Sequence, residues 1–238
     1  MRDRQGGCRA EVTIAARYPE QKRAPASGAL TQEIYTLHGS AVASEAGTRR
    51  LVGVEAQGMT ACPCAQEMVS ESARERLRED GFTDDEIARV FKAVPVATHN
   101  QRGIGTLHIG CPEGCGESLE AEVLLEIVEA SMSSEIYELM KRPDELHVVE
   151  KAHRHPRFVE DCVREMVRMA IERFGALDTS AFVSARQENL ETIHKHNVVA
   201  ERHGLLGDLR REVNFGEQVR HHVTKREWLE DAPSPERL

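Results

Sequence analysis

The apolar positions of this chain follow two kinds of spacing, and the first kind predicts strands. Segments rich in β-branched and small residues, bounded by proline and glycine, are typical of β-strands. Five segments have this character: 11–17, 35–43, 51–57, 104–109 and 181–187. Two prolines and a glycine separate the first two segments, so we expect a loop between them.

The second kind of spacing predicts amphipathic helices, because apolar residues recur every three to four positions. A capping-box pattern at Thr83 begins one helix, which is expected to end at Pro95. The longest helix is expected over 118–141, where Pro143 stops the apolar pattern. Another helix is expected over 156–175.

The order of these elements predicts the fold class. A pair of strands, a third strand, a helical insert and a fourth strand precede two long helices and a last strand. This order is typical of an α+β fold, in which an antiparallel sheet carries a pair of long helices on one face. It does not match the regular alternation of a doubly wound nucleotide-binding fold.

Composition and charge exclude several functional classes. The 238 residues include 31 basic and 40 acidic side chains, a net charge of −9, which excludes the basic surface of a nucleic-acid-binding protein. No apolar run approaches the roughly 20 residues that span a membrane, and the first residues lack the apolar centre of a signal peptide. We therefore expect a cytoplasmic protein, whose six cysteines are thiols or metal ligands rather than structural bridges.

The first candidate for chemistry is the pair Cys62 and Cys64 around Pro63. A proline at this position disfavours a helix, and an extended chain points both sulfurs to one side. One sulfur would then bind a metal while the other takes part in proton or hydrogen-bond chemistry. The alternative is two buried cysteines beside a turn, since a disulfide between positions so close would be strained.

Histidines supply the second candidate. His99 lies in a polar segment with Arg102, whose planar guanidinium suits phosphate or carboxylate, although the segment is equally typical of an exposed loop. His194 and His196 share a face only in an extended chain, and Glu191 precedes them by three residues. A metal site and a pair of surface histidines remain alternatives there.

Charged residues near the predicted helix ends have an ordinary explanation. Lys141 and Arg142 suit the negative end of the long helix, and Glu160 suits the start of the next one. Glu145, just beyond Pro143, is harder to explain in this way. Cysteine, histidine and glutamate ligands together suit Zn²⁺ or Fe²⁺ with an open position for water, so the residues alone predict at most a metal-assisted hydrolase.

Five motifs carry a resemblance to a known family. In chain order they are GMTACPCAQ, THNQRG, KRPDE, FVEDCVR and ETIHKHN. This series resembles the prokaryotic type IB GTP cyclohydrolases over about residues 11–213. The chain has a helical insert at 68–96, between the first two motifs, and in this feature it resembles the archaeal branch of that family.

The resemblance implies a tunnelling fold, in which modules of antiparallel strands and a helix pair assemble into an oligomeric barrel with active sites at subunit interfaces. Residues 1–48 would be the closing hairpin of a first module, 49–213 a second module that carries the metal site, and 214–238 a polar tail. Because the hairpin would expose unpaired edges, we expect a homo-oligomer, a dimer or a tetramer.

The resemblance also implies the roles of site residues. A divalent metal would be held by Cys62, His99, Glu145 and His194. The catalytic residues would be Cys62, Cys64 and His196. Glu160 would bind the guanine ring, and the charge of three cations suggests triphosphate contacts by Arg102, Lys141 and Arg142.

The implied reaction is hydrolysis of GTP at C8 with loss of that carbon as formate. The archaeal branch uses Fe²⁺ and yields 7,8-dihydroneopterin 2′,3′-cyclic phosphate and diphosphate, the first step toward methanopterin-type cofactors, whereas the bacterial relatives yield the triphosphate. Zn²⁺ or Mn²⁺ would also suit the ligands. The competing hypotheses are a truncated, inactive homologue that acts as a metal-binding or assembly subunit, and a thiol redox protein built on Cys62 and Cys64.

Overall fold

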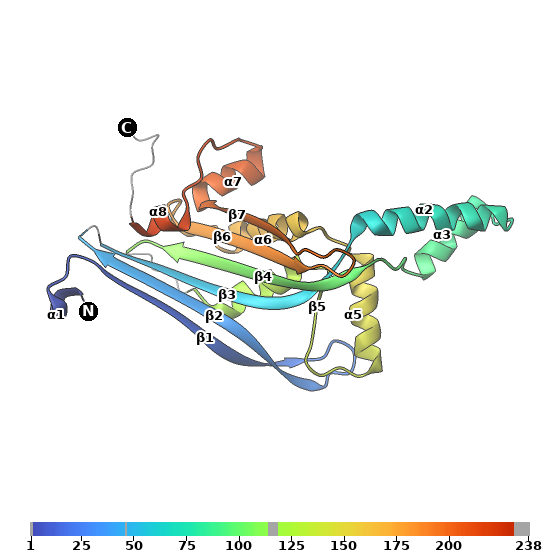
Figure 1. The fold of residues 1–238 in the computed structure, drawn as a ribbon, viewed down its shortest axis with the longest axis horizontal. Helices are drawn as coiled ribbons and strands as arrows, with labels where there is room; N and C mark the ends of the chain where they lie inside the picture. Colours follow the sequence, from blue (N-terminus) through green and yellow to red (C-terminus); the bar gives the residue numbers. More distant parts are fainter. Residues whose placement is uncertain (1, 46, 114–118, 231–238) are drawn as a thin grey trace.

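The computed structural model of the chain describes residues 2–45, 47–113 and 119–230. Within these residues the chain forms a seven-stranded sheet of order β1-β2-β3-β4-β6-β7, with the short β5 paired to β3 (Figure 1). The strands are β1 (Ala10–Arg23), β2 (Leu30–Ser44), β3 (Gly47–Ala61), β4 (Asn100–Cys111), β5 (Ser134–Glu135), β6 (Phe182–Leu190) and β7 (Val198–Leu205). The helices are α1 (Arg2–Gln5), α2 (Pro63–Glu79), α3 (Asp84–Ala93), α4 (Ala121–Ser131), α5 (Arg142–Arg154), α6 (Val159–Arg173), α7 (Leu206–Phe215) and α8 (Lys225–Glu230).

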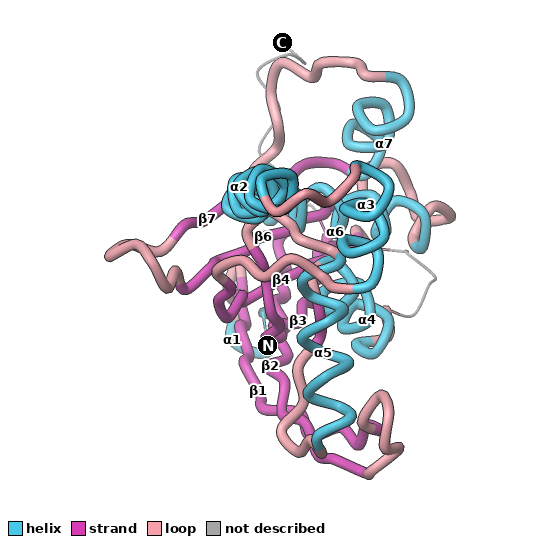
Figure 2. Tube along the Cα trace, turned by 90° about the vertical axis from the view of Figure 1, so that its right-hand side faces the viewer, coloured by secondary structure: helices cyan, strands magenta, loops and turns pink. Residues whose placement is uncertain are grey.

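The predicted α+β class is confirmed. Each pair of neighbouring strands within the described residues is antiparallel. The core lies between one face of the sheet and helices α4 and α6, because alternate residues of β3 and β4 point to that face. Four of these are Val54, Ala56, Leu107 and Ile109, each at most 2% exposed. Figure 2 shows α4 and α6 together on one side of the strands.

The prediction of one long helix over 118–141 is wrong. Helix α4 ends at Ser131, and the next residues cross the end of the sheet, where Ser134 pairs with Met59 of β3. Ser133 and Ser134 are buried there, so tertiary pairing replaces the helical pattern. Pro143 does not stop a helix but lies in the first turn of α5, where its missing N–H leaves no partner unpaired. Residue 118 lies outside the described residues.

Of two predictions about helix starts, at Thr83 and at Pro63, the structure confirms the first and contradicts the second. The Thr83 capping box is confirmed: the Glu86 carboxylate accepts hydrogen bonds from the Thr83 N–H at 2.9 Å and its hydroxyl at 2.7 Å. The expectation that Pro63 blocks a helix is wrong, because Pro63 occupies the first position of α2. Cys62 is therefore the extended residue that caps α2, and Cys64 lies in its first turn.

Part of the segment expected as a polar tail is folded onto the sheet. Trp228 of α8 is 2% exposed, stacks on Phe182 with ring centroids 5.7 Å apart, and donates its indole N–H to the Ser180 carbonyl at 2.9 Å. Gly110 makes room, since a Cβ there would lie 2.7 Å from the indole. Helix α8 thus covers part of the face opposite α4 and α6. The end of the expected tail, 231–238, lies outside the described residues.

None of the described helices is long and apolar enough to cross a membrane.

Acidification is expected to weaken the fold on the face that α8 covers. Burial, together with Lys225 and His38, lowers the pKa of His108 to about 4, so the folded protein keeps this ring neutral. The unfolded chain protonates it near 6.5, and stability is therefore lost as pH falls from 6.5 toward 4, by up to roughly 3 kcal/mol. Urea unfolding of the parent and of His108→Gln at pH 7.5 and 4.5 checks this: the parent should lose more stability than the variant over this interval.

Candidate active site

Three chain segments meet at one end of the sheet, the right-hand end in Figure 1. The register pairs Ala61, at the end of β3, with Asn100, at the start of β4. It also pairs Arg102 of β4 with Leu190, at the end of β6. The residues that follow or precede these positions, Cys62, His99 and the 191–197 loop, therefore lie side by side although they are far apart in sequence.

Backbone hydrogen bonds hold the first two segments together. The N–H of Cys62 donates to the His99 carbonyl at 3.1 Å. The Thr98 hydroxyl in turn donates to the Cys62 carbonyl at 2.9 Å. Cys62 is partly buried and Cys64 is exposed, and the start of α2 favours negative charge beside both. The two cysteines are thus held at the helix start next to His99.

The histidine motif completes this cluster. The His194 ring meets the His99 ring edge-on, with centroids 6.4 Å apart. It also stacks on the His196 ring, with centroids 5.4 Å apart and planes 23° from parallel. His194 and His196 are exposed in the loop between β6 and β7. We call Cys62, Cys64, His99, His194 and His196 the thiol–imidazole cluster.

Glu145 does not join this cluster within the chain. Its neighbour Asp144 accepts hydrogen bonds from Ala26 and Ser27, which places this end of α5 at the β1–β2 turn. The opposite end of α5 reaches the cluster, because His153 contacts the Thr98 carbonyl at 3.3 Å. His153 lies eight positions after Glu145 along the helix, a rise of about 12 Å.

The hydrogen bonds to Asp144 anchor that end of α5 firmly. Burial alone would raise the pKa of this carboxyl, but hydrogen bonds from Ser27, Lys141 and Ala26 hold it well below its usual range. The carboxylate is completely buried and remains charged. The distance of Glu145 from the cluster is therefore built into the way α5 docks on the hairpin.

The three cations expected at the triphosphate lie away from the cluster or on another face. Lys141 and Arg142 begin α5, at the hairpin end. Arg102 is exposed and alternates with Gln101 and Gly103, so it points to the face opposite α4 and α6. It lines a separate cavity with Arg17 of β1. Arg102 therefore lies on a different element from Lys141 and Arg142, which are adjacent in sequence.

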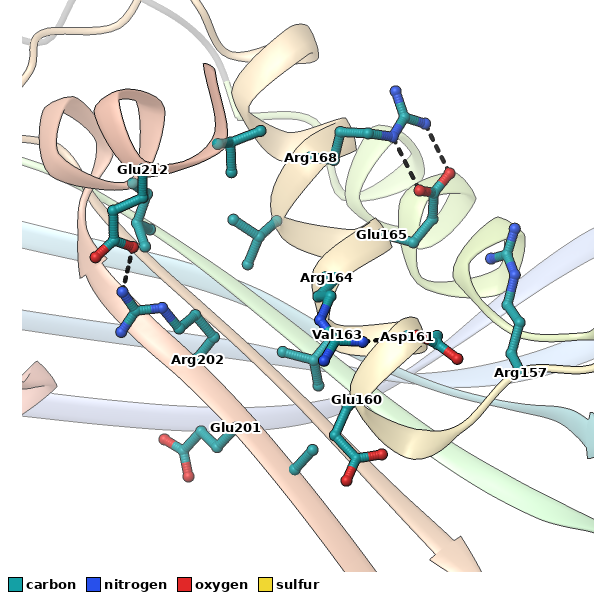
Figure 3. A pocket seen from close by; sticks show the side chains of 14 residues that line it. Arg157, Glu160, Asp161, Val163, Arg164, Glu165, Arg168, Glu201, Arg202 and Glu212 are labelled. Carbon is teal, nitrogen blue, oxygen red and sulfur yellow. Dashed lines mark hydrogen bonds and ion pairs between the residues drawn. The ribbon is translucent and has the colours of Figure 1, made fainter. Parts of the chain in front are cut away.

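Glu160 lines a groove that adjoins the segment carrying Cys62. The groove has a volume of about 640 Å³ and runs between α6, β7 and α7. Figure 3 shows Glu160 in the first turn of α6, and Arg202 paired with Glu212 along the same groove. Arg157 also lines the groove, and its backbone N–H donates to the carbonyl of Ala61 at 3.0 Å. The groove therefore adjoins the segment that carries Cys62.

Burial removes two of the other cysteines as candidates for thiol chemistry. Cys162 is buried, and burial raises the pKa of its thiol to about 12, so it remains protonated and unreactive. Cys111 is buried in the core. Cys115 lies outside the described residues.

The donor types of the cluster suit a divalent metal, while their positions suit it in part. Thiolate and imidazole are the ligands that Zn²⁺ and Fe²⁺ accept, and Cys62, His99 and His194 bring them to one end of the sheet. Among the described residues, however, no three cysteine, histidine or acidic side chains lie close enough to hold one ion. Binding would therefore require side-chain rotation and a further ligand.

Sequence reasoning did not single out Gln101, nor did it predict a contact between Gln101 and Glu191. The Gln101 amide contacts both the His99 ring at 3.2 Å and the Glu191 carboxylate at 3.4 Å. Both residues stand in motifs quoted above, but only the register of β4 and β6 brings them together. The sequence offered one indication: Gln101 follows the candidate ligand His99 by two residues, a spacing that puts both side chains on one side of an extended chain.

The chain belongs to a family of cyclohydrolases: the family model described as type I GTP cyclohydrolase folE2 matches residues 1–200. Proteins named GTP cyclohydrolase MptA are similar to it. The protein from Methanococcus aeolicus is 42% identical over 210 residues, which cover 86% of this chain and 67% of that protein. The protein from Methanocaldococcus jannaschii is 42% identical over 208 residues, covering 86% and 66%. The chain thus spans about two thirds of the length of these relatives.

Among solved structures, uricase from Arthrobacter globiformis matches with a TM-score of 0.43 and 11% sequence identity. The match covers 89% of this chain and 66% of the uricase chain.

Proposed function

We propose that this protein is a metal-dependent GTP cyclohydrolase, which adds water at C8 of GTP and releases that carbon as formate. Membership of the folE2 family supports the reaction class. The observation that carries the proposal is the meeting of Cys62, His99 and His194 from three distant segments at one end of the sheet. Thiol and imidazole groups that converge in this way match the chemistry that such a hydrolysis needs.

We propose that some residues of the cluster bind the metal and that others transfer protons. Cys62, His99 and His194 would hold the metal, with Glu145 as the fourth ligand. A bound divalent metal supplies an acidified water and stabilises negative charge at the reacting centre. Cys64 and His196, both exposed beside these ligands, would hold and transfer protons at the attacking water and at the opening imidazole ring of the substrate.

Glu160 is proposed to select guanine. A carboxylate accepts hydrogen bonds and pairs with the N–H groups on the edge of the guanine ring. Its place in the groove that Arg157 also lines supports this role, because a base bound near Arg157 would lie next to the segment of Cys62. Arg102, Lys141 and Arg142 stay proposed contacts of the triphosphate.

The full reaction would convert GTP and water to 7,8-dihydroneopterin 2′,3′-cyclic phosphate, formate and diphosphate, as a first step toward methanopterin-type pterins. The similarity to MptA proteins supports this product over the bacterial-type triphosphate. Fe²⁺ is the proposed metal, with Zn²⁺ and Mn²⁺ as ions that the same ligands accept.

The proposed assembly is a tunnelling-fold homo-oligomer, a dimer or a tetramer, with a barrel built from the sheets of several chains. The 14-residue strand β1 lies at the edge of the sheet of the described residues, and its apolar Ile14 is 60% exposed. An exposed apolar edge of this length favours pairing with another chain. In this assembly, residues 1–48 would be the closing hairpin of a first module and residues 49–213 would form the second module.

The experiment that tests the proposal is anaerobic incubation of the purified chain with Fe²⁺ and GTP. Formate and diphosphate should form in equal amounts, and phosphorus NMR should show a five-membered cyclic phosphate in the pterin product. Formate with a triphosphate product would reject the cyclic phosphate alone. A folded, metal-loaded chain that releases no formate would contradict the proposed activity.

A further inference from the structure

The side chain of Gln101 lies between the imidazole of His99 and the carboxylate of Glu191. Its Oε1 is 3.2 Å from His99 Nδ1, and its Nε2 is 3.4 Å from Glu191 Oε1. Gln101 is only 6% exposed, so these two groups are its polar neighbours rather than bulk water. His99 directly precedes β4 and Gln101 is the second residue of β4, and the 3.2 Å contact shows that their side chains lie on the same side of the chain.

The chemistry of the three groups allows one arrangement of protons. An ionised carboxylate only accepts hydrogen bonds, so the NH₂ group of Gln101 must face Glu191. The carbonyl oxygen of the same amide must then face His99. Because that oxygen is also only an acceptor, Nδ1 of His99 must carry a proton, and in the neutral ring this leaves Nε2 with a free lone pair.

We propose that Gln101, oriented by Glu191, fixes His99 in the tautomer whose Nε2 is free to bind a metal. This inference rests on the proposed function, in which His99 is a ligand. A neutral imidazole can carry its proton on either nitrogen, and the hydrogen bond made by one nitrogen decides which one the metal meets. Gln101 is thus a positioning residue that acts through His99.

The neighbouring bonds make this arrangement effective. The His99 carbonyl accepts the N–H of Cys62 at 3.1 Å, so the backbone of His99 is held next to that of Cys62, the proposed thiol ligand. The His194 ring lies edge-on to the His99 ring, 6.4 Å away between centroids. Fixing the tautomer therefore prepares one nitrogen on a ring that neighbours the His194 ring and whose backbone is bonded to that of Cys62.

Nitrogen NMR of the metal-free protein tests the tautomer directly. At pH 8, the His99 resonances, assigned by their loss in His99→Gln, should show a protonated Nδ1 and an unprotonated Nε2. A protonated Nε2 would overturn the proposal. Because this measurement uses neither GTP nor a substituted Gln101, it does not depend on the cyclohydrolase activity or on the folding of a variant at that position.

Metal affinity tests the consequence. Gln101→Met, which removes both amide contacts at similar size, should weaken Co²⁺ binding by about 10–100-fold, the usual effect of losing a partner of a ligand. The matched control Gln57→Met, at an exposed glutamine of β3, should leave the affinity unchanged. Equal affinities for the parent and Gln101→Met would contradict the proposal.

The exchange Gln101→Glu with Glu191→Gln separates positioning from mere packing. In the exchanged pair the new amide donates to the new carboxylate, which again accepts the proton on Nδ1, so most of the affinity should return. Gln101→Glu alone sets two carboxylates against each other and should not restore it. An exchange that binds Co²⁺ no better than Gln101→Met would overturn the proposal. Normal tautomer and affinity without formate release would count against the proposed function only.

Discussion

Replacing Cys62 with alanine will abolish formate release from GTP and greatly weaken metal binding. Cys62 is the only proposed thiolate ligand, and its backbone holds His99 through the N–H bond at 3.1 Å, which the substitution preserves. Loss of an outer partner of a ligand already costs about 10–100-fold, so loss of the ligand itself should cost more than about 100-fold. Formate release and Co²⁺ titration measure the two effects.

The matched control is Cys8→Ala, which removes an exposed thiol far from the cluster in sequence and outside every motif of the family resemblance. It should retain parental formate release and metal affinity. A Cys62→Ala protein that binds metal as tightly as the parent would contradict the proposed ligand set. A Cys62→Ala protein that loses only stability would instead support an inactive assembly subunit.

Mixing two inactive variants will restore activity if Glu145 completes the site of a neighbouring subunit. The structure places Glu145 at the hairpin end of α5, while the other proposed ligands lie beyond its opposite end. In a mixed dimer of Cys62→Ala and Glu145→Ala subunits, one shared site would contain both intact residues. Co-expression in equal amounts should then recover about a quarter of parental activity, since half of the random pairs are mixed and each holds one intact site of two.

The activity of the mixture must be compared with that of each variant alone, and oligomer formation must be checked in all three samples. If Glu145 instead serves its own subunit, every mixed pair carries one defect in each site, and co-expression will restore nothing. Activity in Glu145→Ala alone would remove Glu145 from the ligand set. The three results therefore assign this carboxylate to a shared site, to an internal site or to neither.

Local pattern predicted the elements whose hydrogen bonds and contacts are local. The capping box at Thr83 and the amphipathic α6 follow from residues a few positions apart. The pattern failed where distant partners decide, as at Ser134, which pairs with Met59 and so ends the expected long helix. Trp228 gave little signal because its partner, Phe182, lies 46 residues earlier in sequence.

The candidate site was visible only as a set of motifs. The residue types of Cys62, His99 and His194 indicated metal chemistry, but only the antiparallel register brings them to one end of the sheet. The same register joins Gln101 to Glu191, a contact that no spacing along the chain predicts. The place of Glu145 depends on how α5 docks through Asp144, which again depends on long-range contacts.

The most direct test of the proposed function is to follow the carbon that the reaction removes. GTP labelled with ¹³C at C8 is incubated anaerobically with the Fe²⁺-loaded chain, and carbon NMR is recorded over time with Cys62→Ala as the control. We expect one labelled formate for each GTP consumed, and none from the control. GTP consumed with the label retained in the purine product, or labelled formate at equal rates from both proteins, would contradict the cyclohydrolase function.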